Sequence, residues 1–543
     1  MMESNRSCLP KKKLRIYKLI AALGGLISGS PFVIKELWLL GWVASAFLIY
    51  SLVRTDEDGK CSMRRAYAVA YCFFFPFYLC GYYWILYMYP MEYADVTPLF
   101  SACVLTFGLI AMATIFSVAF SFIGPLFVYV SRKVSVTGKF QWLSILTFPF
   151  LWVIFEWIQT LTWAGVPFVW LAVGQQYMLP VIQSASLLGA LFIGFLMTFV
   201  GALLAFAIIH VEKRRFFAIM SLTVFLLNLG FGIVRLAVPD DDEGSKTFVK
   251  AAAIQGNISS IDEKWNMEYS EIRELYIDLI NDAADDGAEL IVVSESALPV
   301  FFNVKPHLFA PFSEIAKDRG MTILLGGYYR TENSDGVYAS GNAIYTVNPD
   351  GSIRDGQYIK RKLVPFGEYV PMRSFIETVF PALTEISMLS VDGGRGEGSE
   401  LHDTVYGMIG SLVCYDSVYN SLALESVRDG AQLLAVSTDD SWFEQSPELY
   451  LHLGHSVLRS IENGRCLVRA ANTGISAIID HKGRVTDPLR AEDIGYSLGE
   501  VEFRSDSTVF TVVGNVIVLL AFIYIFSVCT ISLILKTKRK RKV

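Results

Sequence analysis

The sequence has little net charge and no repetitive tract. Its 543 residues include 46 Lys and Arg against 52 Asp and Glu, which leaves a formal net charge of −6. A net charge this small, and negative, gives no electrostatic reason to expect binding to nucleic acid. The chain also contains no internal repeat and no low-complexity segment apart from a basic C-terminal tail. A repeat architecture and an extended biased region are therefore not expected.

Cysteine is scarce in the more polar part of the chain. Of eight cysteines, only Cys414 and Cys466 lie between residues 239 and 507. The others lie in or beside apolar segments, where they are most simply small hydrophobic residues or cytosolic thiols. Two cysteines in an exported domain can form a disulfide, but the sequence does not give the separation that this bond requires. A disulfide and two free thiols both stay open.

Long apolar runs make up much of the rest. The chain is 53% hydrophobic and 14% aromatic, with a mean hydropathy of +0.43, which is too apolar for an ordinary soluble protein. About 20 apolar residues span the hydrocarbon core of a bilayer. We predict eight spans, of which the fourth and sixth are long enough to need tilt, a kink or an interfacial extension. They lie at residues 17–34, 36–53, 68–90, 98–130, 142–160, 180–210, 215–238 and 508–536.

Lysine and arginine gather in alternate loops between these spans. They precede the first span, follow the second, fourth and sixth, and end the chain, whereas residues 91–97 and 161–177 contain neither. The positive-inside rule therefore predicts that both termini are cytoplasmic and that residues 239–507 are extracytoplasmic. The first span has no clear cleavage site and the second follows at once, so we expect a retained anchor rather than a signal peptide.

Residues 239–507 show the alternating pattern of an α/β domain. Apolar stretches typical of strands alternate with an amphipathic stretch typical of a helix, and turn sequences at Asn348–Gly351 and His481–Gly483 indicate two hairpins. The predicted strands lie at 248–254, 290–293, 321–325, 343–347 and 476–480, and the predicted helix lies at 267–285. This alternation, with polar residues at strand ends, predicts a layered domain.

The most informative residue is Cys414. It ends the apolar run Tyr406–Val413, which is typical of a buried strand, and Tyr415 and Asp416 open a predicted helix after it. A helix N-terminus carries partial positive charge and lowers the pKa of a thiol placed there. Cys414 is therefore a candidate nucleophile, although a buried cysteine taken alone is more often a core residue.

Two upstream segments supply the other groups that a thiol nucleophile needs. Glu295 follows the strand-like run Ile291–Ser294, and Lys360 precedes the run Leu363–Pro371. Glu, Lys and Cys in this order can act as a base, a cation for an oxyanion, and a nucleophile. Each residue alone is weak evidence, because a Glu after a strand is usually solvated and a Lys in a loop is usually at the surface. The run Leu-Val-Pro-Phe-Gly-Glu-Tyr-Val-Pro is too particular for a generic loop.

In these contexts Glu295, Lys360 and Cys414 resemble the catalytic triad of the nitrilase superfamily. Joined to several membrane spans, the segment 360–371 resembles the apolipoprotein N-acyltransferase family of bacteria. The resemblance covers nearly the whole chain. Further matching motifs are Gln255–Asn257 with Trp265, Asn342 before a strand, Asp440–Phe443 and Arg469–Gly474.

The resemblance implies a fold and a division of the chain. The expected fold is a multi-span α-helical membrane domain of about eight helices with an α/β nitrilase-like αββα sandwich. A seven-helix domain is expected at 1–238, an extracytoplasmic catalytic domain at 239–507, and a final transmembrane helix with a basic cytoplasmic tail at 508–543. The expected location is the bacterial inner membrane.

The resemblance also implies a two-step acyl transfer that needs no cofactor and no metal. A membrane phospholipid would donate its acyl chain to Cys414 as a thioester, and the α-amine of a diacylglyceryl apolipoprotein would then accept it. Glu295 would act as the base, and Lys360 would stabilise the oxyanion together with the backbone N–H after Cys414. The residues expected to support the triad are Glu368, Tyr415, Asp416, Asn342 and Trp265.

The choice of Lys360 over Lys362 depends on the family's motif. If residues 358–363 are extended, both lysines project to the same face, so alternation does not choose between them. The motif places the catalytic lysine three residues before the Leu-Val-Pro run, at Lys360. Arg361 and Lys362 would then be surface or lipid-headgroup contacts.

Three residues depart from the family's pattern. Asp416 stands where Glu is usual, Ser294 stands where Pro is common, and Asp439 stands where Asn is usual. These departures leave the triad intact, but they leave open how the acceptor is recognised.

Glu156 is an ionisable residue within a predicted span. Such a residue commonly faces a protein or water-filled interior, with a structural or headgroup role, unless the span is shifted and the residue lies near the interface.

Three other functions fit parts of the pattern. A membrane-anchored nitrilase-type amidase would share the triad but would hardly need eight spans to handle a soluble amide. A Cys–His hydrolase would use His452 or His455, for which no matching nucleophile motif is present. A transporter would carry ionisable residues in several spans, and the sequence offers essentially one.

Overall fold

The computed structural model describes residues 11–56, 62–91, 96–136, 141–161, 165–239, 247–259, 263–332, 337–379, 391–443 and 445–540. The chain divides into two compact units. The helical unit comprises Met1–Leu86, Ala102–Val238 and Asn515–Val543, and the α/β unit comprises Tyr87–Ser101 and Pro239–Gly514.

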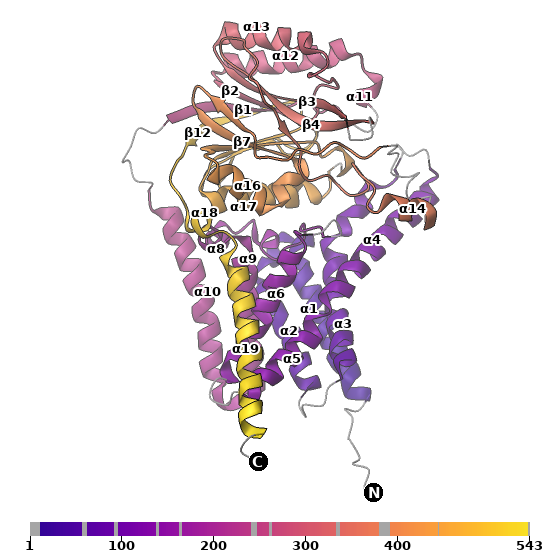
Figure 1. The fold of residues 1–543 in the computed structure, drawn as a ribbon, viewed down its shortest axis with the longest axis vertical. Coiled ribbons are helices and arrows are strands. Elements are labelled where there is room, and N and C mark those ends of the chain that lie inside the picture. The colour runs from indigo at the N-terminus through magenta and orange to yellow at the C-terminus, as the bar shows by residue number, and fades with distance from the viewer. Residues whose placement is uncertain are drawn as a thin grey trace. The chain divides into compact units, whose positions relative to one another are not determined.

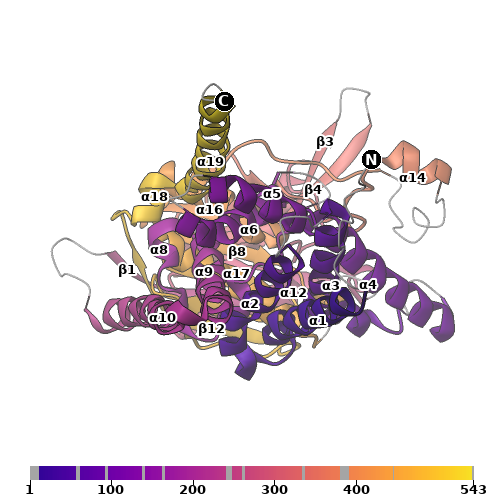
Figure 2. The same cartoon turned by 90° about the horizontal axis from the view of Figure 1, so that it is seen from below.

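The helical unit is a bundle built mostly of long apolar helices (Figure 1, Figure 2). Among the described residues, six stretches are long and apolar enough to cross a membrane. These are Lys11–Val33, Lys35–Thr55, Pro98–Ser135, Ala190–Ile209, Val211–Ala237 and Val516–Leu535. The helices of the unit are α1 (Lys11–Val33), α2 (Gly41–Thr55), α3 (Met63–Gly81), α4 (Pro98–Phe120), α5 (Ile123–Val136), α6 (Thr147–Ile158), α7 (Leu179–Ile182), α8 (Ala185–Leu188), α9 (Ala190–Ile209), α10 (Arg214–Ala237) and α19 (Val516–Lys540).

Six of the eight predicted spans correspond to these stretches. The predicted spans at 68–90 and 142–160 correspond to α3 and to the shorter apolar helix Leu143–Ile158, neither of which is among the six. Both over-long spans are interrupted, as expected. The fourth changes from α4 to α5 after Phe120, and the sixth is divided into α7, α8 and α9.

Glu156 lies in the interior of the helical unit, on α6. Its side chain is buried, and its Oε1 accepts a hydrogen bond from the backbone N–H of Leu171 at 3.0 Å. Gly194 of α9 approaches so closely that a Cβ there would lie 2.7 Å from Oε2. The side chain therefore faces a protein interior, and the carboxylate ties the loop at Leu171 to α6.

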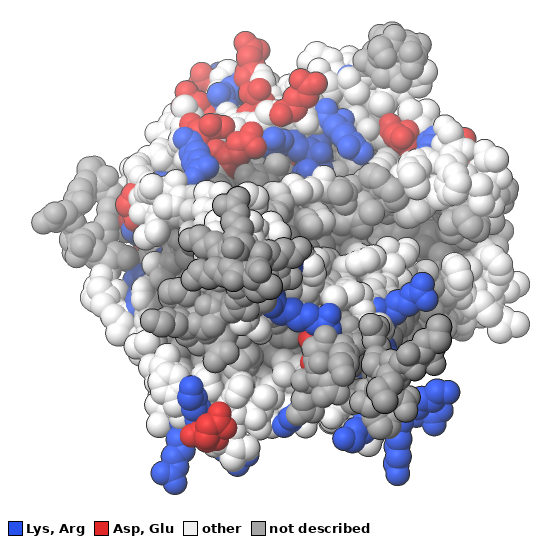
Figure 3. All heavy atoms as spheres, turned by 60° about the horizontal axis from the view of Figure 1, so that its bottom comes forward, with Lys and Arg blue, Asp and Glu red and all other residues white. Residues whose placement is uncertain are grey.

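Basic side chains lie at the ends of several of these helices. Those in the first turns of α1 and α10, and Arg64 of α3, are exposed. With the lower end of the molecule turned forward, Lys and Arg side chains are seen to gather on its surface (Figure 3). The start of α1 and the end of α19 lie at the same end of the helical unit (Figure 1).

The α/β unit contains two six-stranded sheets. The first has the order β12-β1-β2-β3-β4-β5, and the second has the order β11-β10-β9-β8-β7-β6. The strands of the first are β1 (Thr247–Gln255), β2 (Leu290–Val293), β3 (Thr322–Glu332), β4 (Tyr338–Val347), β5 (Tyr358–Ile359) and β12 (Gly495–Phe503). Those of the second are β6 (Leu401–Thr404), β7 (Gly407–Val413), β8 (Leu433–Thr438), β9 (Leu467–Ala471), β10 (Ala477–Ile479) and β11 (Val485–Thr486).

The two sheets pack face to face between two layers of helices. Their facing surfaces share one apolar core, in which Val292 and Leu324 of the first sheet join Ala435 and Val468 of the second. Helices α12 (Tyr269–Asp285) and α13 (Ala310–Arg319) cover one outer face, and α16 (Asn420–Arg428) and α17 (Glu448–Asn463) cover the other (Figure 1). The predicted αββα sandwich is confirmed.

Most predicted elements of this unit are present, and both predicted hairpins form. The strands expected at 248–254, 290–293 and 321–325 are β1, β2 and β3, and the hairpin around His481–Gly483 is the antiparallel pair β10–β11. The hairpin around Asn348–Gly351 also forms: Val347 and Ile353 make an antiparallel bridge, and the N–H groups of Asn348 and Arg354 donate to the carbonyls of Ser352 and Thr346.

Candidate active site

Three of the predicted site residues follow the ends of strands, and the fold brings their segments together. Glu295 follows β2, Lys360 follows β5, and Cys414 follows β7. Asn342 lies within β4 rather than before a strand, because β4 begins several residues earlier than its apolar stretch indicated.

Glu295 and Lys360 form a buried ion pair with two further polar partners. The ammonium of Lys360 donates to Glu295 Oε1 at 2.9 Å and to Glu368 Oε1 at 2.8 Å. The amide of Asn342 donates to the same two oxygens, at 2.5 and 3.0 Å. The other oxygen of Glu295 accepts from the backbone N–H of Asp439 at 3.1 Å. The carboxylate of Glu295 is thus held at both oxygens.

The Leu363–Pro371 motif forms a tight loop that positions Glu368. The backbone N–H of Val364 donates to Glu368 Oε2 at 2.8 Å, and the N–H of Phe366 donates to the carbonyl of Tyr369 at 2.8 Å. Phe366 has a φ of +63°, a left-handed conformation that such a tight turn requires. The motif therefore has a structural role, because it presents one oxygen of Glu368 to the ammonium of Lys360.

The electrostatics of this cluster bring the pKa of Glu295 close to pH 7. Burial raises the pKa of Glu295 to about 7, with Lys360 opposing the rise and Glu368 adding to it. Burial alone would lower the pKa of Lys360, but its interactions with Cys414, Glu295 and Glu368 hold it well above its ordinary value. Lys360 is therefore a cation, and Glu295 is a group that can take up and release a proton near pH 7.

Lys362 lies in a different environment from Lys360. Its ammonium sits over the ring of Tyr419, 4.8 Å from the centroid, in a cation–π contact. Arg361 forms an ion pair with Glu425 at 3.0 Å. Both side chains make contacts within the α/β unit, so they are less accessible for the surface or headgroup contacts that we expected.

Cys414 begins a single 3-10 turn, Cys414–Val418, and has a left-handed φ of +50°. Burial raises the pKa of its thiol well above the ordinary value; Lys360 opposes this, while Glu295 and Asp440 add to it. The expected lowering of this pKa by a helix N-terminus is therefore wrong. One short turn has only a small dipole, so it lowers the pKa of the thiol only slightly. Desolvation and the two carboxylates raise this pKa by more.

Asp416 joins the segment of Lys360 to the end of β7. Its Oδ1 accepts from the backbone N–H of Lys362 at 2.7 Å and of Arg361 at 3.2 Å. Its Oδ2 accepts from the hydroxyl of Tyr358 at 2.9 Å and from the N–H of Val413 at 3.2 Å. This buried carboxylate therefore fixes the lysine segment relative to the nucleophile's strand.

The other predicted residues take varied places. Tyr415 is buried and packs edge-on against Tyr419, with ring centroids 5.3 Å apart. The side chain of Trp265 lies outside the described part of the structure, although its backbone belongs to the short helix Glu263–Asn266. Cys414 and Cys466 are both free thiols, so the disulfide alternative is not realised.

A second buried network beside Cys414 has no counterpart among the predicted site residues. His452 of α17 has its Nδ1 3.0 Å from Asp440 Oδ1 and its Nε2 3.2 Å from the carbonyl oxygen of Cys414. Arg469 of β9 donates to Asp440 Oδ2 at 2.9 Å. Asp440 and Arg469 belong to motifs that match the family, but their pairing through His452 is a contact that no local pattern reveals.

Three of these groups come close enough to hold a metal ion. Ligand atoms of Cys414, Asp440 and His452 lie within 4.8 Å of one another. The carboxylate of Asp440, however, already accepts from Arg469 and from the hydroxyl of Thr438, at 2.9 Å each. Burial alone would raise the pKa of Asp440, but His452 and Arg469 hold it below its ordinary value. We therefore interpret this cluster as a charge-paired network.

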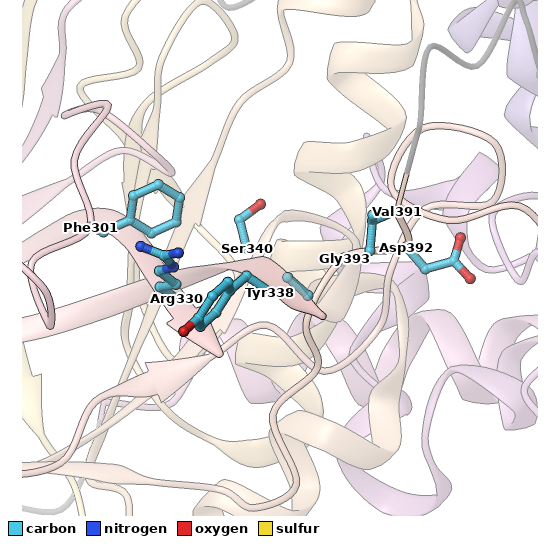
Figure 4. A pocket seen from close by; sticks show the side chains of 8 residues that line it. Phe301, Arg330, Tyr338, Ser340, Val391, Asp392 and Gly393 are labelled. Atoms are coloured by element: carbon cyan, nitrogen blue, oxygen red, sulfur yellow. The ribbon is translucent and has the colours of Figure 1, made fainter. Parts of the chain in front are cut away.

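A shallow cavity of about 270 Å³ borders the face of β4 that carries Asn342 (Figure 4). Ser340 lines it and lies two residues before Asn342, on the same face of the strand. The guanidinium of Arg330 stacks on the ring of Tyr338 at 3.8 Å, and the carboxylate of Asp392 is paired with Arg373. The described lining of this cavity contains no thiol, and its one carboxylate is already paired, so we take the cluster around Cys414 as the candidate reaction centre.

Comparisons with known proteins match both units. A family model described as apolipoprotein N-acyltransferase N-terminal domain matches residues 24–203, and one described as carbon-nitrogen hydrolase matches residues 250–505. The apolipoprotein N-acyltransferase of Geobacter metallireducens is 30% identical over 510 residues, covering 92% of this chain and 92% of its own. That of Pseudomonas syringae pv. tomato is 30% identical over 490 residues, covering 89% and 90%. Among solved structures, a carbon-nitrogen hydrolase from Helicobacter pylori G27 is 16% identical with a TM-score of 0.36, covering 50% of this chain and 94% of that one.

Proposed function

Since the chain belongs to the apolipoprotein N-acyltransferase family, we propose that it moves an acyl chain from a membrane phospholipid, through a thioester on Cys414, to the N-terminal α-amine of a diacylglyceryl apolipoprotein. The observation that carries this proposal is the buried Glu295–Lys360 pair, whose charges act on the thiol of Cys414. A base near neutrality, a fixed cation and a thiol are the groups that acyl transfer needs.

In the first step the thiol of Cys414 transfers its proton to Glu295, and the sulfur attacks the ester carbonyl of the phospholipid. The developing oxyanion is stabilised by Lys360 and by the backbone N–H of Tyr415. The intermediate then collapses: the bond from carbon to the glycerol oxygen breaks, and Glu295 returns the proton to that oxygen. The products are a lysophospholipid and an acyl thioester on Cys414.

In the second step the lipoprotein amine attacks the thioester carbonyl. Glu295, again a carboxylate, removes the proton from the amine, and the oxyanion is held by the same two donors. The carbon–sulfur bond breaks, the amide is released, and the thiol of Cys414 recovers its proton. Because the thioester keeps the acyl group activated, no further activating group enters these steps.

Glu368 and Asn342 act on the catalytic pair rather than on the substrate. Both bond to Glu295 or Lys360, and the negative charge of Glu368 raises the pKa of Glu295 toward neutrality. A base whose pKa lies near the working pH both accepts and returns protons efficiently. We assign these two residues, with Asp416, to positioning of the triad.

We place the enzyme in the bacterial inner membrane with 1–238 as a seven-helix domain, 239–507 as an extracytoplasmic catalytic domain, and 508–543 as a last helix with a cytoplasmic tail. The family models at 24–203 and 250–505 support this division. The alternation of basic loops supports cytoplasmic termini. Both substrates are lipids, which gives the membrane helices a purpose that a soluble amide substrate would not.

Intact-mass measurement of the purified protein tests this function. With phospholipid and no acceptor, we expect the protein to gain one acyl chain in a burst and to release one lysophospholipid, because the two transfers are separable. Addition of a diacylated lipopeptide should then discharge the thioester. Discharge by water as fast as by the lipopeptide would instead support a hydrolase, the amidase alternative.

The pH dependence of acylation tests the assignment of the base. Glu295 accepts the thiol proton only as a carboxylate, and its pKa is about 7. The single-turnover rate of thioester formation should therefore rise with pH along a limb centred near 7. Glu295→Gln should remove both the limb and nearly all of the rate. A wild-type rate that does not change across neutrality would assign the proton transfer to another group.

A further inference from the structure

A second buried lysine lies beside the catalytic pair. Lys264 belongs to the short helix α11 (Glu263–Asn266), and its side chain is fully buried. Its ammonium donates to the carbonyl of Ser296, the residue after Glu295, at 3.0 Å, and it forms an ion pair with Asp439 Oδ2 at 3.3 Å. A buried charge is tolerated only where it is paired and hydrogen-bonded. Lys264 therefore joins the segment after the catalytic base to the end of β8.

Asp439 connects this lysine to the catalytic base. Its backbone N–H donates to Glu295 Oε2 at 3.1 Å, so the two residues are in direct contact. Its own carboxylate accepts from the backbone N–H of Ser441 at 3.1 Å and from the amide of Asn472 at 3.2 Å, besides the ammonium of Lys264. Such donors favour the charged form of a carboxylate. A negative charge therefore lies next to Glu295, and the charge of Lys264 opposes it.

The protonation of Glu295 depends on all the ionisable groups that interact with it or with Asp439. From the elements around them these are Lys360 after β5, Glu368 in the Leu363–Pro371 loop, Cys414 after β7, Lys264 of α11, Tyr276 of α12 and Tyr328 of β3. Burial raises the pKa of the thiol and of both tyrosine hydroxyls, so these three groups are neutral near pH 7. The balance at Glu295 is therefore set by two lysines and two further carboxylates.

We propose that Lys264 is a positioning residue which neutralises Asp439 and thereby keeps Glu295 able to act as the base of the acyl transfer. The proposal rests on the proposed function, because it takes Glu295 as that base. Without the ammonium, the charge of Asp439 would act on Glu295 unopposed and would favour its protonated form, which cannot accept the thiol proton. Lys264 thus serves the reaction through Asp439 and does not touch the reacting atoms.

The pH profile of enzyme acylation tests this role, because removal of either charge should move the limb that Glu295 produces near pH 7. Lys264→Met keeps a long unbranched side chain without the charge, so its limb should move to higher pH by about one unit. Below the limb the single-turnover rate should then be about tenfold lower than in the wild type, and it should recover at higher pH. Asp439→Asn removes the opposite charge, so its limb should move to lower pH.

The double variant Lys264→Met with Asp439→Asn is the decisive comparison. It carries neither charge of the pair, so its limb should return close to the wild-type position. Two independent structural losses would behave differently: they would lower the rate at every pH and would add in the double variant.

Lys482→Met is the matched control. Lys482 is also a buried lysine of the α/β unit, and it lies in the turn between β10 and β11. Because β10 runs antiparallel to β9, and β9 runs parallel to β8, this turn lies at the end of the second sheet opposite to Asp439. Lys482→Met should therefore leave the limb at the wild-type pH.

The outcomes separate this proposal from the function on which it rests. If wild-type protein forms no thioester, the proposed function itself fails. If wild-type protein is acylated but Lys264→Met does not move the limb, the lysine only holds the segment after Glu295 and the positioning role is wrong. The role is also wrong if the double variant keeps the shift of Lys264→Met, because the lysine would then act without Asp439.

Thermal melting of each variant separates a loss of rate from a loss of fold. Should Lys264→Met not fold, Asp439→Asn decides the proposal alone. A limb at lower pH supports it, and an unmoved limb shows that the charge of Asp439 does not act on Glu295.

Discussion

Cys414→Ala is expected to abolish both acylation of the enzyme by phospholipid and N-acylation of a lipoprotein peptide. The reason is that every acyl chain passes through its sulfur, and removal of a nucleophile typically costs on the order of 10⁶ in rate. Cys414→Ser should behave differently: any acyl group that it accepts forms an oxyester, which is less reactive toward an amine than a thioester, so the acylated form should accumulate. Intact mass and lysophospholipid release measure both results.

Cys466 provides the matched control for this experiment. It is the other cysteine of the predicted catalytic domain and is a buried free thiol on the core side of the second sheet. Cys466→Ala should keep thioester formation, with some loss of thermal stability from the smaller side chain. Substantial N-acylation by Cys414→Ala would show that the nucleophile has been assigned to the wrong residue.

Lys360→Ala or Lys360→Arg is expected nearly to eliminate enzyme acylation, whereas Lys362→Ala should leave most of it. Loss of an oxyanion donor typically costs about 10²–10³ in rate. Here the loss should be larger, because Lys360 also separates two carboxylates that its ammonium touches at 2.9 and 2.8 Å. Without it, mutual repulsion of Glu295 and Glu368 would favour the protonated base. Arginine keeps the charge but is too large for the site of a buried ammonium.

The contrast with Lys362 makes this experiment specific. Lys362→Ala removes a cation–π contact with Tyr419 but keeps the backbone N–H that donates a hydrogen bond to Asp416. The three variants are compared by single-turnover acylation, with folding checked by thermal melting. A slower Lys362→Ala than Lys360→Ala would move the catalytic lysine by two residues and weaken the assignment of the triad.

The local parts of this structure could be predicted well from the sequence. The strands before Glu295 and Cys414 are short apolar runs, and hydrophobic patterning is a local property that depends on neighbouring residues. The same holds for the six strongly apolar helices, for the helix at 267–285 and for the turn at His481–Gly483. The motifs around Glu295, Lys360 and Cys414 indicated the family because each is a contiguous run.

The wrong expectation about Cys414 arose because its tertiary environment outweighs a local rule. A helix N-terminus was expected to lower the pKa of Cys414, but burial beside Glu295 and Asp440 raises it. Desolvation is set by residues distant in the sequence, so a window of neighbours does not contain it.

The sequence by itself determined which residue types stand at the ends of which strands, and therefore that a Glu, a Lys and a Cys were available for one chemistry. Strand alternation could not choose between Lys360 and Lys362, and the motif chose Lys360 only by resemblance. The tertiary structure shows that Lys360 meets Glu295, whereas the chain bends at Lys362 and its ammonium lies over the ring of Tyr419. It alone brought His452 to the carbonyl of Cys414, across 38 positions of the chain. The physical reason is the same in both cases: a hydrogen bond acts over about 3 Å in space and is indifferent to separation along the chain.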